Sequence, residues 1–202
     1  MKVHVVPVLH PAFILRGNYK EEPSQVLYLQ RAKEIAQNGW VNFDSTKPPR
    51  GAITKPNLED LSSWLQHIGP GGVTVDIETA RRRLRGVGFC TIDTHLALWV
   101  PLCSQGGGAY WSSKDEGACH LWLRDILRDP GIPKYFHNGL AFDIPILRHN
   151  GYVVNGYAGD TMLMNHIAYP EMSKGLKYLA NLYLGIGGWK ALVSESDEGE
   201  DK

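Results

Sequence analysis

The feature that most constrains the fold is a short alternating segment with two acids, Val73-Thr-Val-Asp-Ile-Glu-Thr79. Successive side chains of a strand point to opposite faces, so Asp76 and Glu78 share one face and lie roughly 6.6 Å apart. Two carboxylates at this spacing repel each other unless donors or cations lie between them. The segment therefore predicts either a site for hard divalent cations, which prefer oxygen ligands, or a strand whose polar face meets solvent.

The surrounding pattern predicts an α/β domain over residues 57–190. Turn and cap signals include the pair Asn57 and Asp60, the turn Asp93-Thr94, and the capping box of Ser113 with Glu116. Periodicity predicts strands at 73–79, 85–92, 95–102, 132–137 and 153–154, and helices at 58–68, 114–128, 140–149, 161–168 and 175–184. This order predicts a mixed sheet, antiparallel first and then parallel, flanked by helices.

Three further segments flank this domain. Residues 1–43 predict a strand through Val8, a turn at His10-Pro11 and a helix from about Ser24 to Gly39, with a stripe of Val26, Leu29, Ala32, Lys33 and Ala36 at helical spacing. Residues 44–56 are rich in proline and polar groups and predict a linker, and residues 191–202 predict an acidic disordered tail. One strand and one helix cannot bury a sufficient core, so the first segment is expected to dock elsewhere.

Polar and acidic residues recur at two strand-to-helix junctions. Asn138 and Asp143 stand near the start of the helix expected at 140–149, where the helix dipole favours a carboxylate. Both also fit purely structural roles, Asn138 as a helix cap and Asp143 as first-turn charge. Asp160 stands at the next junction and fits an N-cap.

The order and spacing of these segments indicate a family. Asp76-Ile-Glu-Thr79, and His137-Asn138 with Phe142-Asp143, resemble the first two motifs of the 3′–5′ exonucleases with four catalytic acids, which have an RNase H-like fold. Further stretches are most similar to the proofreading domains of family A DNA polymerases: Arg85-Gly-Val-Gly-Phe89, Trp99-Val-Pro-Leu102, Asp160-Thr-Met-Leu163 and Gly175-Leu-Lys-Tyr-Leu-Ala180.

This resemblance implies a chemistry and a set of site residues. Asp76, Glu78 and Asp143 would hold two Mg²⁺ or Mn²⁺ ions, which hydrolyse single-stranded DNA from its 3′ end to nucleoside monophosphates. Substrate-binding positions would be Thr79, Arg82, His137, Asn138 and Phe142. Of these, Phe142 fits a core anchor better than a base-stacking group.

The family's third motif, a Tyr or His four residues before a fourth Asp, is not found in residues 189–202. We therefore expect a polymerase domain or a separate chain to supply it. The alternative is a catalytically incomplete nucleic-acid-binding or assembly module.

A second resemblance lies at the start of the chain. Residues 3–37, with His10-Pro-Ala12 followed by Arg16, resemble the C-terminal end of uracil-DNA glycosylases of the bacterial iron–sulfur type. His10 would correspond to the histidine that stabilises the departing uracil, and it also fits an ordinary turn. The other glycosylase motifs are absent from these residues, so no autonomous glycosylase activity is expected. Together the resemblances imply a glycosylase–polymerase replication protein, as in some phages.

Charge and cysteine content limit the kinds of partner, metal site and cellular compartment that the sequence predicts. The 21 basic and 21 acidic residues cancel, but residues 1–194 hold 20 basic against 16 acidic residues, a mildly basic body. The run 81–83 of three arginines fits either phosphate binding or a solvated turn. Three cysteines without a Cys-x-x-Cys pair argue against disulfides and zinc and favour a reducing cytoplasm. The sequence contains no apolar run of the length that a membrane span needs.

Overall fold

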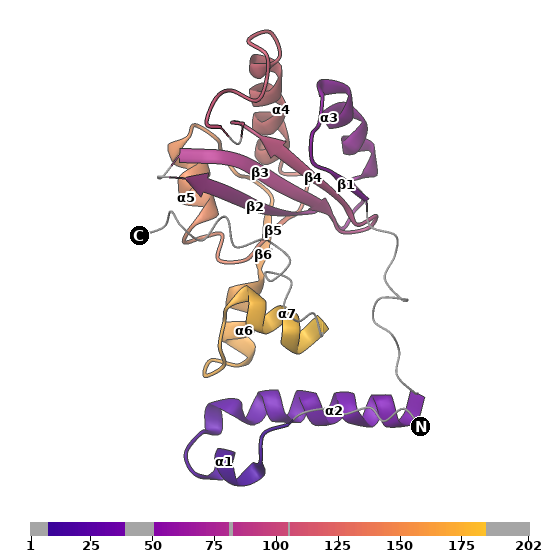
Figure 1. Cartoon of the computed structure of the whole chain (residues 1–202), viewed down its shortest axis with the longest axis vertical. Helices are drawn as coiled ribbons and strands as arrows, with labels where there is room; N and C mark the ends of the chain where they lie inside the picture. Colours follow the sequence, from indigo (N-terminus) through magenta and orange to yellow (C-terminus); the bar gives the residue numbers. More distant parts are fainter. Residues whose placement is uncertain (1–7, 39–50, 81–82, 105, 185–202) are drawn as a thin grey trace. The chain divides into compact units, whose positions relative to one another are not determined.

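The computed structural model describes residues 8–38, 51–80, 83–104 and 106–184. The chain divides into two units, one of Pro48–Thr161 and one of Met1–Lys47 with Met162–Lys202. Figure 1 shows the sheet of the first unit and the helices of the second. Within the described residues, every helix is too short or too polar to cross a membrane.

The first unit is built on a mixed sheet. Its described strands are β1 (Gly51–Ile53), β2 (Val73–Ala80), β3 (Arg83–Thr91), β4 (Leu96–Pro101), β5 (Lys134–Phe136) and β6 (Tyr157–Asp160). They lie in the order β1-β4-β3-β2-β5-β6. β2, β3 and β4 form an antiparallel meander, while β5 and β6 run parallel to β2, which confirms the predicted sheet.

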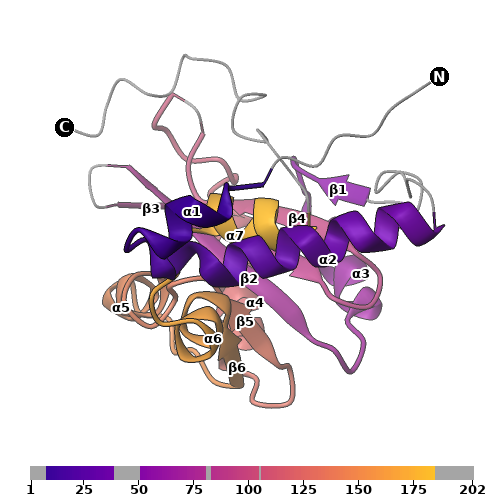
Figure 2. The same cartoon turned by 90° about the horizontal axis from the view of Figure 1, so that it is seen from below.

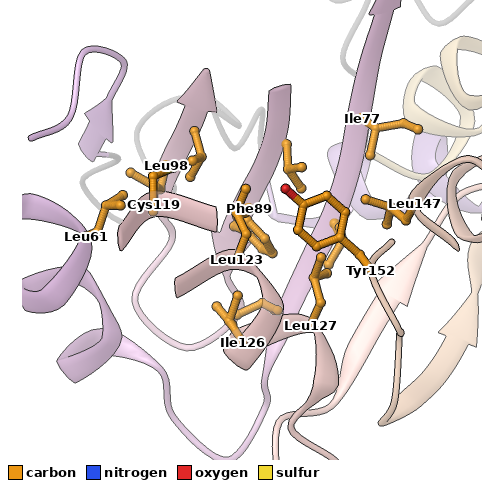
Figure 3. Packing of buried hydrophobic residues seen from close by; sticks show 14 of the residues in the cluster. Leu61, Ile77, Phe89, Leu98, Cys119, Leu123, Ile126, Leu127, Leu147 and Tyr152 are labelled. Atoms are coloured by element: carbon orange, nitrogen blue, oxygen red, sulfur yellow. The ribbon is translucent and has the colours of Figure 1, made fainter. Parts of the chain in front are cut away.

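The hydrophobic core lies on one face of this sheet. Helices α3 (Leu58–Trp64) and α4 (Glu116–Arg128) cover that face (Figure 1). In Figure 3, Leu123 of α4 lies beside Phe89 of β3, and Tyr152 and Leu147 lie near Ile77 of β2. The alternation predicted for β2 is confirmed, because Val73, Val75 and Ile77 are at most 4% exposed, whereas the polar residues between them face away from the core.

The capping box predicted at the start of α3 is confirmed. The Asn57 side chain accepts from the Asp60 amide, and the Asp60 carboxylate accepts from the Asn57 amide, each at 2.9 Å. The box predicted from Ser113 and Glu116 is wrong, because Ser112 instead exchanges hydrogen bonds with Asp115 ahead of α4.

Two strands differ from their predicted positions. β1 falls inside the segment 44–56, expected as a linker, and is too short to show alternation; its pairing with β4 defines it. The strand expected at 153–154 instead begins at Tyr157. There Gly156, at a positive φ of 69°, accepts a hydrogen bond from the Lys134 amide and turns the chain onto β5. Residues 44–50 of the expected linker and the expected tail at 191–202 lie outside the described residues.

The described part of the second unit consists of helices. They are α1 (Pro11–Leu15), α2 (Glu22–Asn38), α6 (Thr161–Ala168), α7 (Leu176–Leu184) and the 3₁₀ turn η1 (Tyr19–Glu21). α1 folds back beside the first turns of α2 (Figures 1 and 2), where the Gln25 side chain exchanges two hydrogen bonds with the backbone of Leu9. His10 caps α1 by accepting from the Ala12 amide at 3.1 Å.

The buried face of α2 differs from the predicted stripe. Val26 and Leu29 are 46% and 51% exposed, whereas Ser24 is 2% exposed. Hydrogen bonds, and not apolar packing, determine which face of α2 meets α7. The Ser24 hydroxyl is hydrogen-bonded to the Tyr178 hydroxyl of α7, and Tyr28 donates to Asn181. Most of the strand expected before His10 lies outside the described residues.

The core contacts of α3 give a stability prediction. Leu61 is fully buried and Leu65, one turn later, is 38% exposed. Leu61→Ala should lower the free energy of unfolding by about 2–5 kcal/mol because it leaves a cavity, and Leu65→Ala by less than about 1.5 kcal/mol. Urea denaturation followed by circular dichroism measures both, and equal losses would contradict this placement of the core.

Candidate active site

The structure brings Asp143 to the strand that carries the other two acids. Asp143 begins α5 (Asp143–His149), in the first turn as predicted, although the helix starts three residues later than expected. Its Oδ1 accepts a hydrogen bond of 3.1 Å from the Ile77 amide in the middle of β2. Ile77 lies between Asp76 and Glu78, so residues 66 positions apart in sequence meet at one place.

Burial and like charge act together on Asp143. Its side chain is only 2% exposed. Burial, and after it the negative charge of Asp76, raise the pKa of Asp143 to about 6, although hydrogen bonds from backbone amides, including that of Ile77, act in the opposite direction. The influence of Asp76 shows that these two carboxylates form one electrostatic cluster.

Asp76 and Glu78 lie on the sheet face opposite the core, and both are exposed. Their partners across the antiparallel pair are Gly88 and Gly86, so the neighbouring strand has no side chains next to the acids. The register shifts between Glu78 and Thr79, a bulge that ends the regular alternation of the strand. The acids therefore border a stretch of β3 that carries no side chains of its own.

Another acid, Asp160, is hydrogen-bonded to the turn that leads to Asp143. It is 2% exposed, and its two oxygens accept hydrogen bonds from the amides of Asn138, at 2.9 Å, and Gly139, at 2.7 Å. Asn138 has a positive φ of 66°, which is uncommon outside glycine. The carboxylate thus fixes a strained turn by charge-assisted hydrogen bonds.

The sequence predicts for Asp160 only an N-cap role. It does not reveal the two hydrogen bonds to the amides of Asn138 and Gly139, which we call the Asp160 clamp. One signal could have indicated it. β6 lies beside β5 in a parallel pair, so an acid that ends β6 meets the turn that follows β5. Thr161 strengthens the same junction, because its hydroxyl is hydrogen-bonded at 2.8 Å to Nδ1 of His137.

The remaining predicted site residues take different positions. Thr79, His137 and Asn138 are half-buried near the acids, on β2 and on the turn after β5. Phe142 is 44% exposed, so its interpretation as a core anchor is wrong; it precedes α5 with a backbone that is not yet helical. Arg82 lies outside the described residues, whereas Arg83 begins β3 and is exposed.

Comparison with known proteins identifies the family. The sequence matches the family model of a 3′–5′ exonuclease over residues 52–196. This chain belongs to the 3′–5′ exonuclease family. No curated protein sequence matches it.

Solved structures confirm the RNase H-like fold of this exonuclease-family chain. One similar structure is the POL domain of Pol1 from M. smegmatis in complex with DNA primer-template and dNTP, with 23% identity and a TM-score of 0.50, over 68% of this chain and 23% of that one. Another is Trypanosoma brucei RNase D in complex with RNA U12, with 15% identity and a TM-score of 0.52, over 71% of this chain and 50% of that one. The chain thus spans half or less of each.

The donor set fits the divalent ions that exonucleases of this family generally use. Asp76, Glu78 and Asp143 offer carboxylate oxygens, the ligands that Mg²⁺ and Mn²⁺ prefer, and a cation would offset the repulsion by Asp76 that adds to the effect of burial on the pKa of Asp143. Across residues 8–38, 51–80, 83–104 and 106–184, no group of three His, Cys, Asp or Glu side chains is placed to hold an ion. The described residues supply the type of ligand that such ions prefer.

The raised pKa of Asp143 predicts an unusual stability effect. Its folded-state pKa of about 6 lies above the ordinary value of 3.8. The ionised carboxylate therefore lowers the free energy of unfolding by its full amount above pH 6, and this loss disappears as the pH falls from 6 towards 4. Asp143→Asn keeps an acceptor for Ile77 and removes the charge. In EDTA it should raise the free energy of unfolding by about 1–3 kcal/mol at pH 8 and much less at pH 4.5.

Urea titrations at the two pH values measure this effect. Asp125→Asn is the control, because the Asp125 side chain is 65% exposed beside Arg124 and should change stability by less than about 1 kcal/mol at either pH. An Asp143→Asn variant that is destabilised equally at both pH values would contradict the assignment.

The Asp160 clamp predicts a second effect. Asp160→Asn presents an amide donor to one of two buried backbone amides, and should lower the free energy of unfolding by about 2–4 kcal/mol. Asp93→Asn is the matched control, because the exposed Asp93 carboxylate also accepts from a backbone amide, that of Gly71 at 2.9 Å, and its loss should cost less than about 1 kcal/mol. Thermal or urea unfolding compares the two, and equal costs would argue against the clamp.

Proposed function

We propose that this chain is the nuclease domain of a metal-dependent exonuclease that removes nucleoside monophosphates from the 3′ end of single-stranded DNA. The observation that carries the proposal is the hydrogen bond between Ile77 and Asp143, since it joins the first two family motifs into one acidic cluster. A carboxylate held against β2 beside Asp76 supports a two-metal phosphodiester hydrolysis, because that mechanism needs acidic oxygen ligands gathered at one place.

The three acids share one role in this proposal. Asp76, Glu78 and Asp143 would be the ligands of two Mg²⁺ or Mn²⁺ ions. When bound, such ions lower the pKa of a water molecule and stabilise the charge that develops on the leaving 3′ oxygen. Asp143 is held in place by the Ile77 amide, and as a carboxylate with a pKa of about 6 it is anionic at neutral pH. Protonation of Asp143 below pH 6 would remove one ligand.

Polar and cationic residues border the acids and would bind the strand. Thr79 follows the bulge of β2, and His137 and Asn138 lie on the turn held by Asp160. Arg83 opens β3 at the exposed end of the hairpin, and Arg82 precedes it. Phosphate contacts of this kind position a strand without reading its sequence. The choice of DNA rests on the resemblance of the segments Arg85–Phe89 and Trp99–Leu102 to polymerase proofreading domains.

A second candidate is a binding or assembly module of a glycosylase–polymerase replication protein. It is favoured by the lack of a three-ligand metal group among the described residues. In this case the site would stay catalytically incomplete, whereas in the first candidate a polymerase domain or a separate chain would bring the family's third motif. The segment around His10 would be the glycosylase-like part, although here His10 caps α1.

Hydrolysis of labelled oligonucleotides distinguishes the two candidates. With 5′-labelled single-stranded DNA and Mg²⁺ or Mn²⁺, we expect a ladder of shortened products that EDTA abolishes, with a rate that falls as the pH drops below 6. Asp76→Ala should reduce the rate by at least about 100-fold, since it removes a metal ligand. Asp125→Ala, an exposed acid on α4, should leave the rate unchanged.

The opposite outcomes are equally clear. Equal laddering by Asp76→Ala and the unmodified chain would reject the proposed site. Salt-dependent DNA binding without hydrolysis at any metal concentration would favour the binding module. Faster degradation of single-stranded RNA than of DNA would overturn the substrate assignment.

A further inference from the structure

Trp99 lies on the sheet face that carries the acids. In the register of the sheet, Asp76 pairs with Gly88, and Gly88 pairs with Trp99. Residues directly opposite in antiparallel strands point to the same face. Its neighbours Leu98 and Val100 point into the core and are at most 1% exposed, whereas Trp99 is half-buried on the opposite face.

The indole ring of Trp99 lies over the two glycines of β3. A Cβ at Gly86 would lie 2.4 Å from Cζ2 and 2.6 Å from Cη2 of the ring, and one at Gly88 would lie 3.8 Å from Cε3. All three atoms belong to the six-membered ring, so the ring extends along β3 from Gly88 to Gly86. A side chain at Gly86 would clash with the indole ring in this position, so a glycine is needed there.

The ring therefore lies over the strand next to the acids. Gly86 pairs with Glu78, and adjacent strands lie about 4.8 Å apart, so the far end of the ring is one strand away from the acidic strand. One face of the ring rests on glycine backbone. This arrangement differs from the packing of Trp64 and Trp122, which contact Phe89 and each other on the core side.

We propose that Trp99 is a stacking platform for a nucleobase of the strand whose phosphate lies at Asp76, Glu78 and Asp143. This inference rests on the proposed function and adds a base-binding subsite to it. An aromatic ring supported from below and located one strand from the acids suits a base, because every base has a flat π face. The subsite binds bases irrespective of sequence, since it offers stacking and no hydrogen-bond code.

The test compares strands with and without a base. Fluorescein-labelled single-stranded DNA carries one abasic analogue at the 3′-terminal, second or third nucleotide, and anisotropy in Ca²⁺ gives the affinity of each. The unmodified chain should bind the complete strand at least about fivefold more tightly than the abasic strand at one of these positions. In Mg²⁺ or Mn²⁺, the same preference should appear in KM, with a smaller change in kcat.

Two substitutions at Trp99 separate stacking from packing. Trp99→Leu keeps an apolar cover over Gly86 without an aromatic face, and Trp99→Phe keeps the face. Trp99→Leu should lose the preference for the complete strand while its affinity for the abasic strand stays within twofold of the unmodified chain. Trp99→Phe should keep most of the preference. Gly117→Ala is the control that should change neither, because Gly117 is exposed on α4 and a Cβ there would meet nothing within 4 Å.

The outcomes distinguish the two proposals. A Trp99→Leu variant that folds and keeps the full preference for the base overturns the stacking subsite and leaves the proposed function standing. Equal binding of complete and abasic strands by the unmodified chain also overturns the stacking subsite and leaves the proposed function standing. Absence of both DNA binding and hydrolysis in the unmodified chain overturns the proposed function and the subsite with it.

Discussion

The hydrogen bond from the Ile77 amide to the Asp143 carboxylate is the contact on which the candidate site depends. β2 uses its apolar side chains to build the core and its polar ones to carry two acids, and this bond places a third acid against the same strand. The carboxylate is buried beside Asp76, which raises its pKa to about 6. The fold therefore carries a local electrostatic cost at this place, as is common where function requires it.

That cost is tolerated because the turn before Asp143 is itself held firmly. Asp160 accepts from two consecutive backbone amides, and Thr161 is hydrogen-bonded to His137. A buried carboxylate with two short bonds stabilises a backbone conformation that Asn138 would rarely adopt alone. The acids of this region thus divide into a group proposed to meet the metal and substrate, and one that orders the backbone beneath them.

The glycines of β3 have the complementary role. Gly86 and Gly88 leave the sheet surface beside the acids without side chains, and Trp99 of β4 occupies the space over them. On the other face the same strands contribute Phe89, Leu98 and Val100 to the core. Alternation along each strand therefore separates stability from function, since core packing lies on one face and the reactive groups on the other.

The sequence by itself determined what depends on neighbours along the chain: the alternation of β2, the Asn57–Asp60 capping box, the meander, and the first-turn position of Asp143. Only the tertiary structure decided the pairing of β1, the start of β6, the exposed face of α2 and the clamp by Asp160. The physical reason is the range of the interaction. Periodicity and caps act over a few residues, whereas the partners of Asp160 lie 21 and 22 positions away and that of Asp143 lies 66 away, so no local pattern reveals them.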